Sequence, residues 1–325
     1  MRLSLPSIRL RTLTGRLVRW ALVATLALGC AHRLAAHSGD SGLPNVALKT
    51  AGGQQLWADL AWEADWRVQR HVFTGHCRLL DPADVRRGWG SEAAMLGALR
   101  LRSATGELRA PRSRAVILLH GLWRTRDLMR PMKVAFEDAG YDVLDLGYPS
   151  TRAPVASHAA QVAALLERLP HDYDDVSFVT HSLGALVVRQ LLADPGAAWR
   201  TRHGLGRAVF IAAPNGGAAL ARVADSIPGV YLLYGEPSRE IAAGLPARLP
   251  VPEMPFITIA ASRGCAGGWN PLIPGDDDGV VGVAEARLDG SKADFVVSGI
   301  HTFVMRDEGV VETAVDFVSG EPIRR

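Results

Sequence analysis

Val176 to Leu192 reads VSFVTHSLGALVVRQLL, in which an apolar stretch of strand length runs through THSLG into an apolar stretch with helical spacing. A serine on a sharp turn between a buried strand and a helix has its hydroxyl pushed away from the backbone at the helix N-terminus. Backbone N–H groups at that end face any anion that develops on a bound group. The sequence therefore predicts that Ser182 is a nucleophile.

Small residues on either side of this serine let the strand and the helix approach closely. Glycine is usual two positions before and two positions after the serine; Gly184 keeps the second position, but Thr180 takes the first. Thr180 is small enough to be tolerated, although it weakens the motif as a bare pattern. The assignment of Ser182 therefore depends on the rest of the chain.

A second apolar run, AVILL from Ala115 to Leu119, has the length of a strand and ends in HGLW, residues 120–123. The glycine lets the backbone turn tightly after the strand, which leaves the N–H of Leu122 free. We expect this N–H and that of Leu183 to face a carbonyl oxygen that becomes negative during a reaction. His120 is expected to be a structural group that holds the loop.

The histidine expected to act as a base lies near the end of the sequence. ADFVV, from Ala293 to Val297, predicts a last strand, and His301 follows it and opens a segment with helical spacing. A histidine after the final strand can reach a serine at the C-terminal edge of a sheet. An imidazole titrates near neutrality, so it can take a hydroxyl proton and return it to a leaving group.

The sequence predicts no metal and no cofactor. The other histidines considered lie in polar or basic surroundings and do not pair at a metal-ligand spacing; they are His37, His71, His76, His158, His171 and His203. Cys30, Cys77 and Cys265 are isolated from one another, so they do not form a zinc motif.

Several segments together resemble the lipase and esterase branch of the α/β-hydrolases. They are VILLHGLWRT, DYDDVSFVTHSLGALVVRQLL, AAPNGGAAL, and DDDGVVGVAEARL followed by GIHTFVM, and the resemblance covers about residues 114–320. YPSTR, residues 148–152, is similar to the YPSR-type loop of a subgroup of bacterial serine esterases. That subgroup tends to carry an N-terminal extension resembling WRVQRHVFTGHCRLLDP, residues 66–82.

The resemblance also implies an acid. SDG- or NDG-like turns followed by paired valines commonly hold the acid of lipases, and this sequence has DDDGVV at residues 276–281. Asp278, directly before the glycine, is the expected acid, and the resulting order of serine, acid and histidine is that of the family. Three adjacent carboxylates are otherwise typical of a solvated turn, or of a calcium loop, whose alternating ligand spacing is missing here.

The resemblance implies hydrolysis of a carboxylic ester, with Ser182, Asp278 and His301 as catalytic residues and the amides of Leu122 and Leu183 as the oxyanion hole. The expected partner is a small ester or lipid substrate. An acyltransferase or thioesterase would use the same triad, so that alternative stays open. A non-catalytic, membrane-tethered binding protein is a further alternative, but it has no need of a triad and an oxyanion loop together.

Length and composition agree with a single large globular unit. The chain has 325 residues, of which 48% are hydrophobic, enough for one sheet covered by helices on both faces. Strand and helix patterns alternate between residues 115 and 212, which predicts the α/β-hydrolase fold, a mainly parallel doubly wound sheet. The catalytic domain is expected at 114–325, with either a small apolar cap or an ordinary helix and loop at 215–255.

Residues 38–113 are expected to form an N-terminal extension of strands or a hairpin packed on the core. Four tryptophans are dense there, namely Trp57, Trp62, Trp66 and Trp89. Strands that extend the main sheet would bury these indoles, whereas the alternative is an apron that faces substrate or membrane.

The net charge of +3 is unevenly distributed. Residues 1–40 contain six arginines and one acid, a net charge of +5, so the remaining residues carry −2. The body has no basic stripe with interleaved aromatics, and no nucleic-acid partner is expected. The basic start precedes a short apolar run, Trp20 to Ala31, which fits a secretory signal and is too short to span a bilayer comfortably, since that needs about twenty residues.

Residues 1–37 are therefore expected to be a signal peptide or a lipoprotein signal and anchor. Cys30 follows a small residue as in a lipoprotein processing site, although the usual residue order is not kept; the alternatives are cleavage after Ala36 and an uncleaved tail. The protein is expected to be exported, either anchored to a membrane at Cys30 or periplasmic, with secretion as the alternative. Export would allow Cys77 and Cys265 to pair if their geometry permits.

Overall fold

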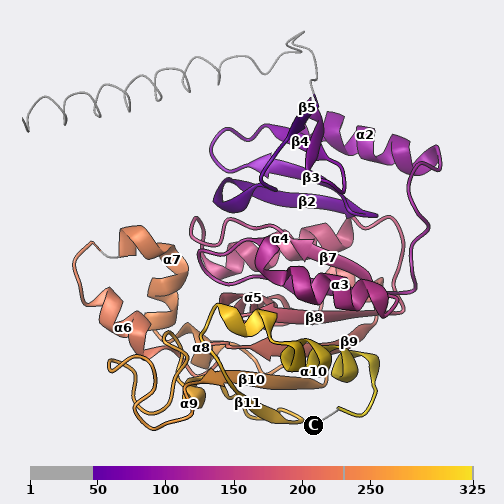
Figure 1. The fold of residues 1–325 in the computed structure, drawn as a ribbon. Helices are drawn as coiled ribbons and strands as arrows, with labels where there is room; N and C mark the ends of the chain where they lie inside the picture. Colours follow the sequence, from indigo (N-terminus) through magenta and orange to yellow (C-terminus); the bar gives the residue numbers. More distant parts are fainter. Residues whose placement is uncertain (1–46, 230, 324–325) are drawn as a thin grey trace, which may run out of the picture. The chain divides into compact units, whose positions relative to one another are not determined.

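The computed structural model describes residues 47–229 and 231–323, so the expected export signal at residues 1–37, with Cys30, lies outside the described residues. The larger of two sheets has six strands in the order β11-β10-β9-β8-β6-β7, and all neighbouring strands in it are parallel (Figure 1). These strands are β6 (Arg114–Leu119), β7 (Asp142–Leu146), β8 (Asp175–His181), β9 (Leu205–Ile211), β10 (Phe256–Ser262) and β11 (Asp294–Ser298). The predicted parallel sheet is confirmed.

Helices cover both faces of this sheet, as the doubly wound prediction requires. They are α3 (Arg130–Asp138), α4 (Val155–Glu167), α5 (Leu183–Leu191) and α10 (Glu308–Ser319). Successive strand residues point to opposite faces: Ile117 and Leu119 join the core formed with α4 and α5, whereas Val116 and Leu118 join the core formed with α3 and α10. Because β7 and β8 lie on opposite sides of β6, the strand order reverses there, which is where such sheets bind ligands.

Short elements lie in the connections between these strands. They are η2 (Arg126–Met129), η3 (Ala198–Thr201), α9 (Val283–Ala286) and η4 (Phe303–Arg306). The helical spacing that begins at His301 does not give one continuous helix, because η4 intervenes and Asp307 caps α10 by accepting a hydrogen bond from the N–H of Val310 at 3.0 Å.

The N-terminal extension forms a sheet of its own rather than extra strands on the main sheet. Its antiparallel order is β1-β5-β4-β3-β2, with β1 (Leu48–Lys49), β2 (Trp57–Glu63), β3 (Trp66–His71), β4 (Cys77–Leu80) and β5 (Val85–Gly90). The helix α2 (Glu92–Ala104) packs Met95 and Leu99 against one face. Of the four tryptophans, Trp62 is buried in the main core and the other three are half-buried.

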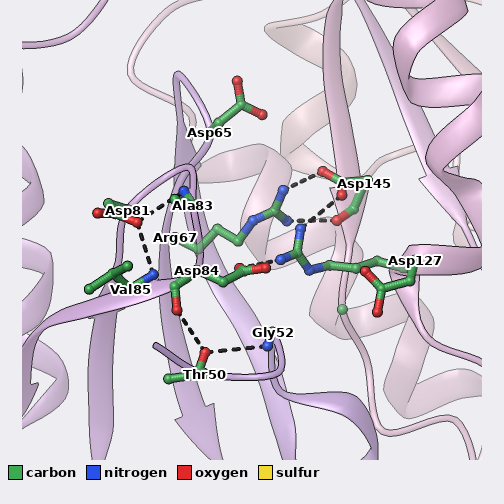
Figure 2. A network of polar contacts seen from close by, with 12 residues as sticks. Thr50, Gly52, Asp65, Arg67, Asp81, Ala83, Asp84, Val85, Asp127 and Asp145 are labelled. Carbon is green, nitrogen blue, oxygen red and sulfur yellow. Dashed lines mark hydrogen bonds and ion pairs between the residues drawn. The ribbon is translucent and has the colours of Figure 1, made fainter. Parts of the chain in front are cut away.

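The opposite face of the small sheet carries buried charged side chains that contact the main sheet (Figure 2). Arg67 of β3 forms ion pairs with Asp59 at 3.2 Å and with Asp145 at the end of β7. Arg126 and Lys133 also contact Asp145, at 2.9 and 3.2 Å. Burial would raise the pKa of Asp145, but Arg67 and the other two cations outweigh burial and lower this pKa to about 2, so the network stays charged.

Three helices occupy the region where a cap was expected, namely α6 (Ala219–Asp225), α7 (Tyr231–Ala242) and α8 (Leu245–Arg248). Arg189, buried in α5, donates hydrogen bonds to backbone carbonyls on both sides of these helices: Asn215 before them, and Pro246, Leu249 and Pro250 at their end. This one side chain therefore ties both ends of the insertion to the core.

Two further features bear on membrane association and disulfide pairing. Among residues 47–229 and 231–323, no helix combines the length and the hydropathy that a bilayer crossing requires. In the same part of the chain, Cys77 is a buried free thiol and Cys265 an exposed one.

Candidate active site

Ser182 alone forms the turn between β8, which ends at His181, and α5, which begins at Leu183. Its φ of 53° and ψ of −120° are strained for a residue with a side chain. The N–H of Ser182 donates to the carbonyl of Ile211 at 2.9 Å, which holds the turn against β9. The serine is 8% exposed.

Glycine is required where two neighbouring elements press against this turn. A Cβ on Gly184 would lie 2.5 Å from the carbonyl oxygen of Leu119, so α5 approaches β6 more closely than any other residue would allow. A Cβ on Gly121 would lie 2.7 Å from Nδ1 of His181. Thr180, which stands where the serine motif usually has glycine, is fully buried. Its hydroxyl donates a long hydrogen bond to the carbonyl of Val209 at 3.4 Å.

The structure brings the serine, the acid and the histidine together in one hydrogen-bonded chain. Nε2 of His301 lies 3.0 Å from Oγ of Ser182, and Nδ1 of the same ring lies 2.7 Å from Oδ2 of Asp278. A carboxylate can only accept, so Nδ1 carries the proton and Nε2 is free to accept from the serine hydroxyl. Asp278 is held in turn by the N–H groups of Val280 and Val281, at 2.9 and 2.8 Å.

The two neighbouring aspartates build the turn that presents Asp278. Asp277 accepts hydrogen bonds from the N–H groups of Asn270 and Gly279, and Asp276 accepts from those of Arg263 and Gly264. Of the three aspartates, only Asp278 is hydrogen-bonded to the histidine within the described part of the chain. Those residues also contain no group of three or more His, Cys, Asp or Glu side chains that could hold a metal ion.

The amides expected to form an oxyanion hole are both available. Within residues 47–229 and 231–323, neither the N–H of Leu122 nor that of Leu183 has a hydrogen-bond acceptor. Leu183 is the first residue of α5, where helical N–H groups are unpaired. A Cβ on Gly121 would lie 3.0 Å from the Cβ of Ser182. The loop after β6 and the turn at Ser182 therefore lie side by side. Two free N–H groups beside a serine suit stabilisation of a developing oxyanion.

His120 is buried at the start of the loop after β6, which carries Gly121 and Leu122. Its Nδ1 donates to the carbonyl of Gly121 at 2.9 Å, and its ring stacks on that of Tyr148 with centroids 4.3 Å apart. The hydroxyl of Tyr148 donates to the carbonyl of His120. Burial lowers the pKa of His120 to about 4, so the ring is uncharged at neutral pH.

His181 has a position in the site that the sequence pattern did not predict. Its Nε2 donates to the carbonyl oxygen of His301 at 2.8 Å, and the two rings lie 4.7 Å apart. Burial, with His301 nearby, lowers the pKa of His181 well below its ordinary value. The neutral ring of His181 therefore fixes the backbone of His301. The one sequence signal that could have indicated this role is the place of His181 directly before Ser182.

Comparison with known proteins gives structural neighbours only. No protein-family model and no curated protein matches the chain. The chain is similar to the mature form of a Bacillus licheniformis lipase, with 17% identity, a TM-score of 0.47, and coverage of 65% of this chain and 91% of that one. It is also similar to a metagenomic carboxyl esterase, with 22% identity, a TM-score of 0.41, and coverage of 59% of this chain and 65% of that one.

A third neighbour is a hydrolase from Oleispira antarctica, with 14% identity, a TM-score of 0.41, and coverage of 64% of this chain and 92% of that one. The fold itself is defined by the chain's own features: the parallel strand order, the helices on both faces, and the strained serine between β8 and α5. The chain has the α/β-hydrolase fold.

Proposed function

We propose that the protein is a serine hydrolase that cleaves carboxylic esters through an acyl-enzyme on Ser182. The observation that carries this proposal is the hydrogen-bonded chain from Asp278 through His301 to Ser182, with two amides beside the serine that have no acceptor among the described residues. A serine hydroxyl is a weak nucleophile until an adjacent base takes its proton, and an oriented imidazole within hydrogen-bond distance supplies that base.

In the acylation step, Nε2 of His301 takes the hydroxyl proton as Oγ of Ser182 forms a bond to the ester carbonyl carbon. The negative charge that develops on the carbonyl oxygen is stabilised by the N–H groups of Leu122 and Leu183. The carbon–oxygen bond to the alcohol then breaks, and His301 returns the proton to the departing alcohol. Asp278 holds the ring and stabilises its transient positive charge.

Deacylation repeats the sequence with water in place of the serine. His301 removes a proton from water, the resulting hydroxide attacks the acyl carbon, and the bond to Ser182 breaks with the proton returning to Oγ. The carboxylic acid is then released. No group beyond this chain's own side chains and water is needed for the balance of either step.

Turnover of chromogenic esters of rising acyl chain length tests this proposal. We expect release of the alcohol from at least the short-chain esters, and Ser182→Ala should lower this turnover by at least about a thousandfold. Absence of turnover by the wild-type protein on every ester would contradict the proposal. The related neighbours bear the names lipase and carboxyl esterase, which guides the choice of substrates.

An acyltransferase or thioesterase would use the same residues, and acceptor competition separates these activities. With a fixed ester and increasing alcohol or thiol, a hydrolase keeps releasing free acid as its main product. Predominant transfer of the acyl group to the alcohol or thiol would instead assign a transferase. Preferential cleavage of a thioester over the matched oxygen ester would assign a thioesterase.

We propose further that the chain is exported and tethered through a lipid on Cys30, on the strength of its basic start and apolar run. More than one acyl chain gives stable membrane attachment. Intact-mass analysis of the mature protein is the test, and a lipid-modified N-terminus at Cys30 is the expected result. An unmodified N-terminus at His37 would mean ordinary signal cleavage. Cys30→Ser should prevent the lipid modification, and we expect it to leave catalysis unchanged.

A further inference from the structure

The loop that carries Leu122 has a strained turn of its own. The N–H of Arg124 donates to the carbonyl of Gly121 at 3.1 Å, which closes a turn with Leu122 and Trp123 in its centre. Trp123 has a φ of 58°, which the third residue of such a turn adopts when the central peptide is reversed from its commonest orientation. Glycine is the usual residue there, so a tryptophan needs support from outside the turn.

That support begins at the loop after β7. Oγ of Ser150, a residue with no exposed surface, accepts a hydrogen bond from the N–H of Trp123 at 3.1 Å. This N–H belongs to the central peptide of the turn, which joins Leu122 to Trp123. The hydrogen bond to Ser150 therefore holds that peptide in the orientation that gives Trp123 its strained φ. The hydroxyl of Ser150 then donates to Oε1 of Gln55 at 3.2 Å.

Gln55 belongs to η1 (Gln54–Leu56) in the N-terminal extension. Its side-chain amide contacts the loop after β7 through its oxygen and the end of the turn through its nitrogen. Oε1 accepts hydrogen bonds from Ser150 and from the N–H and hydroxyl of Thr151, each at 3.2 Å. Nε2 donates to the carbonyl of Arg124 at 2.8 Å. One side chain from the extension therefore holds the turn at its end and holds the serine that fixes its centre.

The same turn is tied to the loop of the catalytic histidine. The guanidinium of Arg124 donates to the hydroxyl of Thr302 at 2.7 Å, and Thr302 directly follows His301. Since Gln55 fixes the backbone of Arg124, it acts on both the oxyanion loop and the histidine loop. An amide that must meet an oxyanion is sensitive to displacements of this kind, because misplacement of reacting groups by about 1 Å can cost a hundredfold in rate.

We infer that Gln55 is a positioning residue for the oxyanion hole, acting through Ser150 and Arg124 on the amide of Leu122, so that the N-terminal extension contributes to the active site. This inference rests on the proposed hydrolase function. It predicts that removal of the Gln55 amide weakens stabilisation of the transition state more than it weakens binding of the ester or folding.

The test compares Gln55→Ala with Gln54→Ala, its exposed neighbour in η1, in the full chain. We expect kcat on a short-chain ester to fall about tenfold in the first variant, with KM and the unfolding midpoint matching those of the second. Inhibition by a trifluoromethyl ketone, whose serine adduct carries an oxyanion, should weaken by a similar factor. Ser150→Ala should reproduce the loss, and the double variant should add little to it.

Equal kcat values for Gln55→Ala and Gln54→Ala would overturn the inference, as would a loss that appears in KM or follows the folded fraction. If Gln55→Ala does not fold, Gln55→Glu decides, because it keeps the acceptor for Ser150 but removes the donor to Arg124; an unchanged kcat would then contradict the inference. Labelling of Ser182 by a fluorophosphonate separates the two claims. An unlabelled wild-type protein defeats the proposed function, whereas equal labelling rates in wild type and Gln55→Ala defeat only the positioning role.

Discussion

Strained backbone around the site is held by hydrogen bonds from neighbouring elements. Ser182, Trp123 and Ala212 have φ values of 53°, 58° and 49°, which cost on the order of 1–3 kcal/mol each. The N–H of Ser182 donates to the carbonyl of Ile211, and that of Ala212 donates to the carbonyl of Ile259. The N–H of Trp123 donates to Oγ of Ser150. Such residues persist only where the surroundings over-determine their conformation, so the site is preorganised by the fold.

At this scale, the acid is tested by comparing three adjacent aspartates. Asp278→Asn should lower kcat/KM by about 10³–10⁴, because an amide that donates to the ring favours the wrong tautomer of His301. Asp276→Asn and Asp277→Asn should cost stability through lost contacts to backbone N–H groups, but less than about tenfold in activity per folded molecule. Steady-state kinetics on all three variants is the measurement, and equal losses would contradict the assignment.

Buried neutral histidines make the stability depend on pH. Burial lowers the pKa of His120 and of His158 to about 4, below the value of 6.5 expected for unfolded chain. The contribution of each neutral ring to the free energy of unfolding is therefore fully present above about pH 6.5. It is lost as the pH falls toward 4, and the loss is on the order of 3 kcal/mol for each ring. Urea unfolding between pH 7.5 and 4.5 should show a smaller loss in His158→Gln than in wild type, and parallel losses would refute this contribution.

At the scale of elements, apolar runs predicted the main sheet closely because β6 to β10 are largely buried on both faces; β11, at the edge, has only exposed and half-buried residues. The apolar run from Ala115 to Leu119 is β6 (Arg114–Leu119), and the last strand expected at Ala293 to Val297 is β11 (Asp294–Ser298). The small sheet was less predictable, because buried Asp59, Arg67 and Gln69 break its apolar alternation. The helix α2 was not predicted at all.

The contact between β6 and α5 is tested with a matched pair of glycines. Gly184→Ala should destabilise the protein by about 1–3 kcal/mol and lower activity, because its Cβ would press on the backbone carbonyl of Leu119 and displace the turn at Ser182. Gly97→Ala is the control; a Cβ there meets open space in the interior of α2, so it should stabilise by up to about 1 kcal/mol. Urea unfolding measures both, and a neutral or stabilising Gly184→Ala would contradict the packing described.

At the scale of the whole catalytic unit, residues far apart in sequence form the site and its support. The sequence indicated Ser182 and His301 by their surroundings and Asp278 through the family resemblance, and the structure brings the three within hydrogen-bond distance. Their catalytic roles remain predictions. The roles of Gln55 and Arg67 could not be predicted, because their partners lie many residues away and no local pattern connects them.

Arg67 joins the two sheets, and its removal should leave Asp59 without its buried counter-charge and Asp145 with only Arg126 and Lys133. Arg67→Ala is expected to lower the free energy of unfolding by about 3–5 kcal/mol. Arg87→Ala removes a partly exposed ion pair with Asp81 and should cost less than about 1 kcal/mol. Chemical denaturation of both variants is the measurement, and losses of equal size would show that the buried network does not join the sheets as described.

The central claim is that Ser182 is the nucleophile, and covalent trapping tests it most directly. The wild-type protein is incubated with a fluorophosphonate, digested, and mapped by mass spectrometry, with Ser182→Ala, confirmed as folded by circular dichroism, treated in parallel. The account predicts a single adduct on the peptide that contains Ser182 and no adduct in the variant. An adduct on any other residue, or undiminished labelling of Ser182→Ala, would contradict it.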